Sequence, residues 1–161
     1  MTRSYDLFAE TNPAFGTFVA ITFCRSFQET AGSPPNIALL YLAVPIAMSS
    51  DTQASFSATN VTTGLLSWLK KFPDVQHQLG QRLNASLSIV TASLRFGLSS
   101  HALEIVDDGL VGLGYDVPAK AQTDKLPSGP KQAIKRAERL GIWMANAGTP
   151  GSIFSAFGVV P

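Results

Sequence analysis

The residue types that a nucleophilic site needs come together just before a tight turn. The stretch Ser99-Ser100-His101 precedes Asp107, and acyl-transfer enzymes combine a serine hydroxyl, an imidazole base and an orienting carboxylate. Serine is frequent in this chain, however, and Asp107-Asp108-Gly109 is explained by turn chemistry alone. We therefore interpret this region as a polar corner that leads into a hairpin, and we expect no catalytic residue in the chain.

A metal site or a cofactor site is not expected either. Zinc sites need about four nitrogen or sulfur ligands at close spacing, whereas His77, His101 and Cys24 are far apart in the sequence. Cys24 lies in an apolar segment, which is typical of a small buried side chain rather than of a reactive thiol. The sequence also lacks a Gly-Lys-Ser/Thr phosphate loop and a dinucleotide-binding glycine pattern.

One group of charged residues has a coherent geometry. Lys131, Lys135, Arg136 and Arg139 are spaced so that they lie along one side of a helix. A solvated helix face is the commonest meaning of such a pattern. The functional alternatives are contact with an acidic protein surface and contact with phosphates.

The helix that carries these cations is predicted within residues 130–161. Pro130 suits its first turn and Gly148 ends it. Its other face is apolar and contains Ala133, Ala137, Leu140, Met144 and Ala147. A second apolar segment follows, and we expect it to be docked rather than loose. Its residues Ile153, Phe154 and Phe157, together with Trp143, are predicted to form core or protein interface.

Two further helices are predicted near the start of the chain. Asn12 is a good cap and Pro13 a good first residue for a helix over residues 12–31, which carries an aromatic face and ends at Gly32. Residues 35–48 are apolar on every side, so their periodicity fits either a buried helix or a buried strand. We expect a kinked helix, because Pro45 suits a central strand even less. Residues 49–60 are interpreted as a polar connection.

The middle of the chain has features of a winged-helix arrangement. Residues 61–98 contain two helical patterns joined at Phe72-Pro73-Asp74, as in a helix-turn-helix motif. Two apolar runs within residues 102–113 flank Asp107-Asp108-Gly109, which predicts a hairpin in the position of a wing. Residues 114–130 are expected to form a long surface loop. The predicted fold is mainly α with a small β-hairpin (α+β), as a single compact domain over residues 1–161.

Composition favours binding over chemistry. The chain has 161 residues, of which 45% are hydrophobic and 14% charged, well below the roughly 25% charged residues of typical soluble domains. Its net charge of +1 combines about −3 over residues 1–117 (six basic, nine acidic) with +4 over residues 118–161 (six basic, two acidic).

Asp6 and Glu10 interrupt any secretion signal, and the apolar run 37–48 is too short to span a bilayer. We expect a cytoplasmic protein without membrane contact.

Several short motifs, in this order, resemble a known family. They are Asn12-Pro13-Ala14-Phe15, Leu42-Ala-Val-Pro45, Trp68-Leu69, Gln81-Arg82-Leu83, the hairpin after Phe96-Gly97, Leu140-Gly141-Ile-Trp143, Ile153-Phe154 and Phe157-Gly158-Val159-Val-Pro161. Together they resemble the middle component of prokaryotic three-component ABC-ATPase (ABC-3C) defence systems, a group that includes the Lamassu type.

The resemblance implies a non-catalytic subunit that bridges two partners. These are an SMC- or Rad50-like ABC ATPase and an effector such as a nuclease, with DNA contact only indirect, within the complex. The alternative is a winged-helix DNA-binding regulator with residues 73–98 as recognition helix, although Arg82 and Arg95 are the only basic residues there. An enzyme with a small-molecule pocket is a third class, for which the sequence supplies few ionisable candidates.

Overall fold

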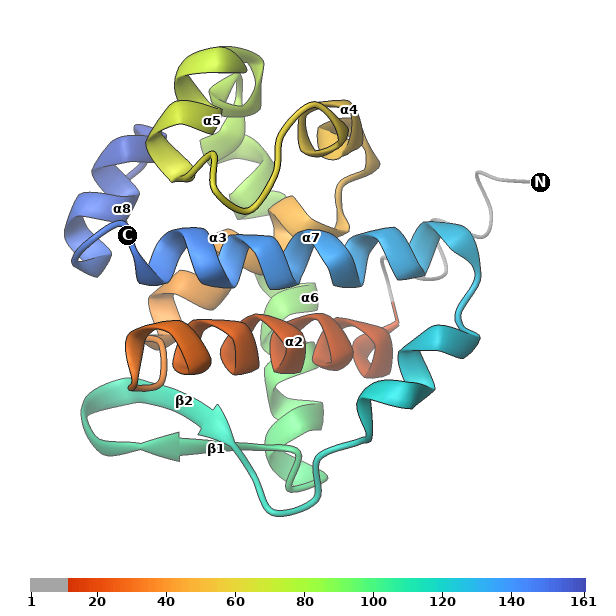
Figure 1. Cartoon of the computed structure of the whole chain (residues 1–161). Helices are drawn as coiled ribbons and strands as arrows, with labels where there is room; N and C mark the ends of the chain where they lie inside the picture. Colours follow the sequence, from red (N-terminus) through yellow and green to blue (C-terminus); the bar gives the residue numbers. More distant parts are fainter. Residues whose placement is uncertain (1–11) are drawn as a thin grey trace.

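Helix α2 (Pro13–Ala31) lies at the centre of the computed structural model, which describes residues 12–161 (Figure 1). The Asn12 side chain accepts a hydrogen bond from the Ala14 N–H at 3.0 Å, and Gly32 ends the helix with φ +81°. Both ends are therefore where the capping residues predict them. Asp6 and Glu10, which argue against a secretion signal, lie outside the described residues.

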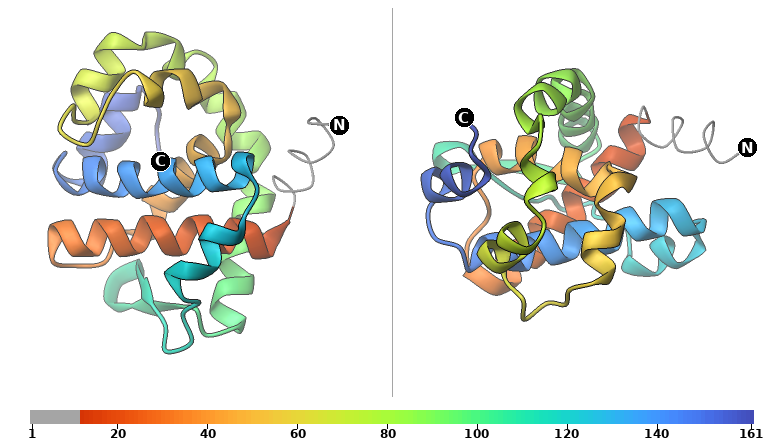
Figure 2. Two further views of the ribbon diagram at one scale, coloured as in Figure 1. Left: turned by 45° about the vertical axis from the view of Figure 1, so that its right-hand side comes forward. Right: turned by 90° about the horizontal axis from the view of Figure 1, so that it is seen from above.

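Helix α7 (Ser128–Ala145) lies beside α2 and runs in the same direction (Figures 1 and 2). The two helices share the most extensive contact in the structure. A glycine makes this approach possible: a β-carbon on Gly141 would clash with Ser26 Oγ and lie 2.8 Å from the Phe23 carbonyl oxygen. The small face that brings α7 onto α2 is the predicted one, with Ala133, Ala137, Leu140 and Met144 buried.

Two more helices complete the packing around α2. Helix α3 (Ile37–Met48) is a helix despite Pro45, as expected, and seven of its twelve residues are buried. Helix α6 (Leu79–Ser99) packs against both α2 and α3. Where α6 crosses α2, Gly16 faces Ser93, and the Thr17 hydroxyl donates to the Ser93 carbonyl oxygen at 2.6 Å.

Short elements cover the end of this helical layer. Residues 49–60 are not only a polar connection, because they contain the 3-10 turn η1 (Ser50–Thr52) and the helix α4 (Gln53–Ser57). Helix α5 (Leu65–Lys71) packs on α7 and α8, and the turn η2 (Pro73–Gln76) then leads to α6. Helix α8 (Pro150–Phe157) is capped by Thr149 and ends at Gly158. The predicted docked tail is thus a short helix on the body of the protein.

The predicted hairpin is confirmed. Strands β1 (Leu103–Val106) and β2 (Leu110–Leu113) pair antiparallel, with Val106 opposite Leu110 and the turn η3 (Asp107–Gly109) between them. The β2 strand lies against α2, and the Val111 N–H donates to the Pro35 carbonyl oxygen at 2.9 Å. The expected loop 114–130 includes a 3-10 helix, η4 (Lys120–Lys125). The fold is therefore mainly α with one small hairpin, as the sequence predicts.

A single core joins these elements. Cys24 is fully buried in it on α2, and burial raises the pKa of its thiol to about 12. Its role as a small apolar side chain is as expected. Among the helices of residues 12–161, none is both long and apolar enough to cross a membrane.

The Gly141 contact gives a direct test of the α2–α7 packing. We expect Gly141→Ala to lower the free energy of unfolding by about 1–3 kcal/mol, because the added methyl group meets the α2 backbone. Gly80→Ala is the matched control: a β-carbon there meets nothing within 4 Å, so the change should be neutral or stabilise the helix by up to about 1 kcal/mol. Urea unfolding measures both, and equal effects would contradict the close packing.

Candidate protein interface

The four residues predicted as core or interface anchors lie together inside the chain. Trp143 contacts Trp68, with 5.2 Å between ring centroids, and Trp68 in turn contacts Phe157 at 6.2 Å. Ile153 and Phe154 of α8 are buried in the same core. The Trp143 indole N–H donates to the Val61 carbonyl oxygen at 2.9 Å. In this conformation these anchors hold α8 and α5 on α7 and are covered by the chain itself.

The four predicted cations do not share one solvated face. Lys135 is exposed and Lys131 half-buried, but Arg136 is only 5% exposed. The Arg136 Nε donates to the Ala47 carbonyl oxygen at 2.7 Å, and its Nη1 donates to Gln53 Oε1 at 2.6 Å. The expectation that Arg136 points away from the apolar face is therefore wrong. Its position three residues after Ala133 and four before Leu140 is a signal of this orientation in the sequence.

Arg139 is also used internally. Its Nη1 donates to the Phe56 carbonyl oxygen at 2.5 Å and to the Thr59 carbonyl oxygen at 3.1 Å. The guanidinium carbon lies 5.6 Å from the centroid of the Phe56 ring and 5.8 Å from that of Trp143, within the range of cation–π attraction. Burial lowers the pKa of Arg139, but a guanidinium stays protonated at physiological pH. Lys131 and Lys135 are thus the members of the cluster best placed to contact an acidic surface or phosphates.

The residues considered for catalysis lie on the surface. His101 and Asp107 are exposed, and the His101 ring stacks on Tyr115 at 4.7 Å. The Ser100 hydroxyl donates to the Gly97 carbonyl oxygen at 3.3 Å. Within the described part of the chain, no three His, Cys, Asp or Glu side chains lie close enough together to hold a metal ion.

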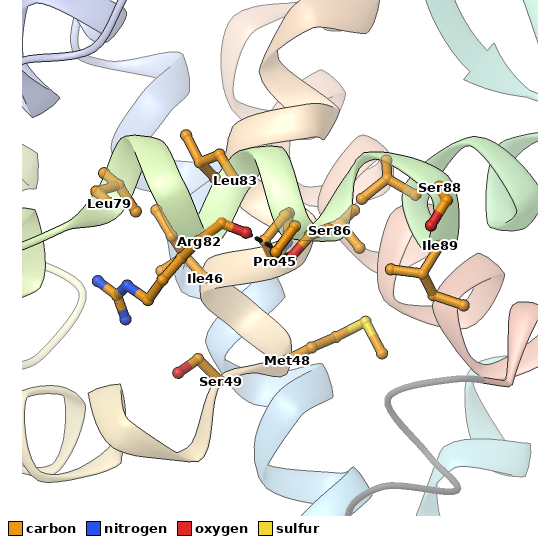
Figure 3. A pocket seen from close by; sticks show the side chains of 13 residues that line it. Pro45, Ile46, Met48, Ser49, Leu79, Arg82, Leu83, Ser86, Ser88 and Ile89 are labelled. Carbon is orange, nitrogen blue, oxygen red and sulfur yellow. Dashed lines mark hydrogen bonds between the residues drawn. The ribbon is translucent and has the colours of Figure 1, made fainter.

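A hollow lies between α3 and α6, on a side of the molecule that the sequence reasoning missed (Figure 3). Its volume is about 450 Å³. Pro45, Ile46 and Met48 line it from α3, and Leu83 and Ile89 line it from α6. The Arg82 guanidinium lies at one end of this hollow, and Ser88 lies at the other (Figure 3).

A second, more open hollow continues along α6 toward the start of α2. Pro13, Leu87 and Phe96 line it, and Ser88 lines both hollows. Leu87 is 47% exposed and Phe96 48%, so two large apolar side chains face solvent beside this hollow.

One row of α6 residues follows both hollows. Its members recur at steps of three, four, three, four and three, none is buried, and each lines one of the two hollows: Arg82, Ala85, Ile89, Ala92, Phe96 and Ser99. We call this row the α6 stripe. The sequence signal for it is that Ile89 and Phe96 fall outside the Leu79, Val90 and Leu94 face that packs into the core.

The buried arginine yields a stability prediction. We expect Arg136→Met to destabilise the fold by about 1–3 kcal/mol, because the Ala47 carbonyl loses its charged donor while the stem volume is kept. Lys135→Met removes the same charge from the neighbouring exposed position and should change stability by less than about 0.5 kcal/mol. Thermal unfolding of both variants at one pH checks this. A similar loss from the two changes would mean that only charge, and not the internal hydrogen bonds, matters.

The chain was also compared with known proteins. It matches the family model described as ABC-three component (ABC-3C) system Middle Component 3 over residues 5–161. No curated protein and no solved structure gave a match. Because the family match covers nearly the whole sequence, the chain belongs to the Middle Component 3 family of ABC-three component systems.

Proposed function

We propose that this chain is a non-catalytic bridging subunit of a prokaryotic anti-phage or anti-plasmid defence complex. It couples an SMC-like ABC ATPase to an effector such as a nuclease, and it acts in the cytoplasm. The observation that carries the proposal is the match to middle components over residues 5–161. A subunit that bridges two partners acts by the surfaces it offers to them.

The surface chemistry supports a binding role. The α6 stripe and its two hollows expose apolar side chains along one long helix, and exposed apolar patches of this kind mark protein interaction sites. The two arginines of α7, Arg136 and Arg139, are engaged in holding backbone carbonyls. Lys131 and Lys135 remain candidates for a second, acidic contact on α7.

A reconstitution experiment tests the bridging role. The ATPase, the effector and this chain are purified separately, and the effector is immobilised. We expect the ATPase to be retained only when this chain is added, because the chain supplies both contacts. Retention of equal amounts of ATPase without the chain would contradict bridging. Omitting the effector gives the background.

A winged-helix DNA-binding regulator is the alternative function. Its support is the order of helix, turn, helix and hairpin, namely α5, η2, α6 and β1–β2. However, α5 packs on α7 and α8, whereas the two helices of a helix-turn-helix motif pack on each other. Arg82 also donates to the Val75 carbonyl oxygen at 2.7 Å, which leaves Arg95 as the basic group of α6 most available to phosphate.

DNA titration separates the two functions. The purified chain is titrated onto duplex DNA at about 50 mM salt and again at about 200 mM salt. We expect weak binding at both salt concentrations, with a dissociation constant no tighter than the roughly 10⁻⁶ M of nonspecific complexes. Tight binding that falls steeply with salt would favour the regulator.

A further inference from the structure

We propose that the α6 stripe binds an amphipathic helix with carboxylates on its flanks, contributed by one of the two partner subunits. This inference rests on the proposed bridging function and assigns one of its two contacts to a definite surface. The residues of the α6 stripe are far in sequence from Trp143 and from the basic residues of α7.

The spacing of the α6 stripe indicates that its partner is a helix. Alternating steps of three and four residues keep side chains on a single seam of an α-helix, which is the spacing used when two helices pack along their length. Ala85 and Ala92 alternate with Ile89 and Phe96 along this seam, so small positions leave room for side chains of the partner. At about 1.5 Å per residue the stripe from Arg82 to Ser99 is about 26 Å long, which matches nearly five turns of a partner helix.

Charge complementarity indicates an acidic partner. Helix α6 contains no Asp or Glu, and Arg82 and Arg95 are the only charged residues among the described residues that line the two hollows. The Arg82 Nη2 donates a hydrogen bond to the Val75 carbonyl oxygen, but the Arg82 Nε is buried and has no hydrogen-bond partner within the described chain. A buried Nε is shielded from the side chains of a partner, so the contact open to a carboxylate is with the charged guanidinium where it lies at one end of the hollow (Figure 3). Arg95 is exposed.

The positions of the two arginines define the partner further. Arg82 and Arg95 are thirteen residues apart, or about 20 Å along the helix axis. The partner helix therefore carries carboxylates about 20 Å apart on the edges of an apolar seam. A second copy of this chain does not supply them through the same face, because the α6 stripe has no acidic residue.

Affinity measurements with matched variants test the proposal. The dissociation constant of the chain is measured for the purified ATPase subunit and for the purified effector subunit. We expect Arg95→Glu and Phe96→Ser each to weaken binding to one of these subunits about tenfold or more, since one reverses a flanking charge and the other removes an apolar contact. Lys70→Glu and Leu66→Ser make the same chemical changes at exposed positions on α5 and should leave both affinities within about twofold.

Cross-linking identifies the occupant. Ser88 is exposed and lines both hollows, and Cys24 is buried with its thiol protonated, so Ser88→Cys accepts a maleimide-benzophenone label selectively. Irradiation of the reconstituted complex should join position 88 to an acidic, helical segment of the ATPase or effector. Attachment to a second copy of this chain or to its residues 1–11 would overturn the inference.

The outcomes separate this inference from the proposed function. If the complex forms and Arg95→Glu and Phe96→Ser bind as tightly as the unmodified chain, the assignment to the α6 stripe is wrong while bridging stands. If the unmodified chain binds neither subunit, both proposals fall.

Discussion

The structure depends on hydrogen bonds from one face of α7 to the backbone of residues 47–61. Short helices leave their last carbonyl groups without partners, and this segment contains the end of α3 and all of α4. Arg136 donates to Ala47, Arg139 donates to Phe56 and Thr59, and Trp143 donates to Val61. The donors follow one another along α7 in the same order as their acceptors follow one another along the chain. A positively charged side chain at the carboxyl end of a helix also offsets the partial negative charge there.

This attachment determines what else can pack. It fixes Phe56 over Trp143, with the rings stacked at 5.6 Å, and Trp68 contacts both of them. The α8 helix then closes the cluster through Phe157. On its opposite side α7 approaches α2 closely through Gly141. Helix α7 therefore joins the aromatic cluster to the central layer. The rings of this cluster are buried within the chain, whereas α6 is a long helix with a row of residues that no described element covers.

Local signals in the sequence predict much of this fold, and long-range partners explain what they miss. The Asn12 cap, the glycine after α2 and the Asp-Gly turn act within a few residues, so α2 and the hairpin follow from the sequence. The α4 helix is short, polar and held by Arg139 from 83 residues away, so its own sequence resembles a loop. Arg136 is predicted as solvated because charge dominates its local pattern, although its acceptors lie on α3 and α4.

The same distinction between local signals and long-range contacts applies to the functional site. The sequence indicates a binding protein through its low charge and its family motifs, and the family is confirmed by the match over residues 5–161. Which apolar face is exposed depends on which faces the other helices cover, and this is a property of the whole fold. Trp143 and Phe157 are buried because α5 and α8 fold over them, whereas Phe96 is exposed because no described element covers that side of α6.

The parallel arrangement of α2 and α7 has a consequence for how the protein is made. Residues 32–127 separate the two helices in sequence, so a ribosome releases the aromatic α2 long before its main neighbour exists. Contacts between such distant segments form late and slow the folding of a chain. During translation the nascent α2 and α3 therefore present apolar surface of the kind that chaperones bind, and translation that stalls before residue 128 leaves a fragment prone to aggregate.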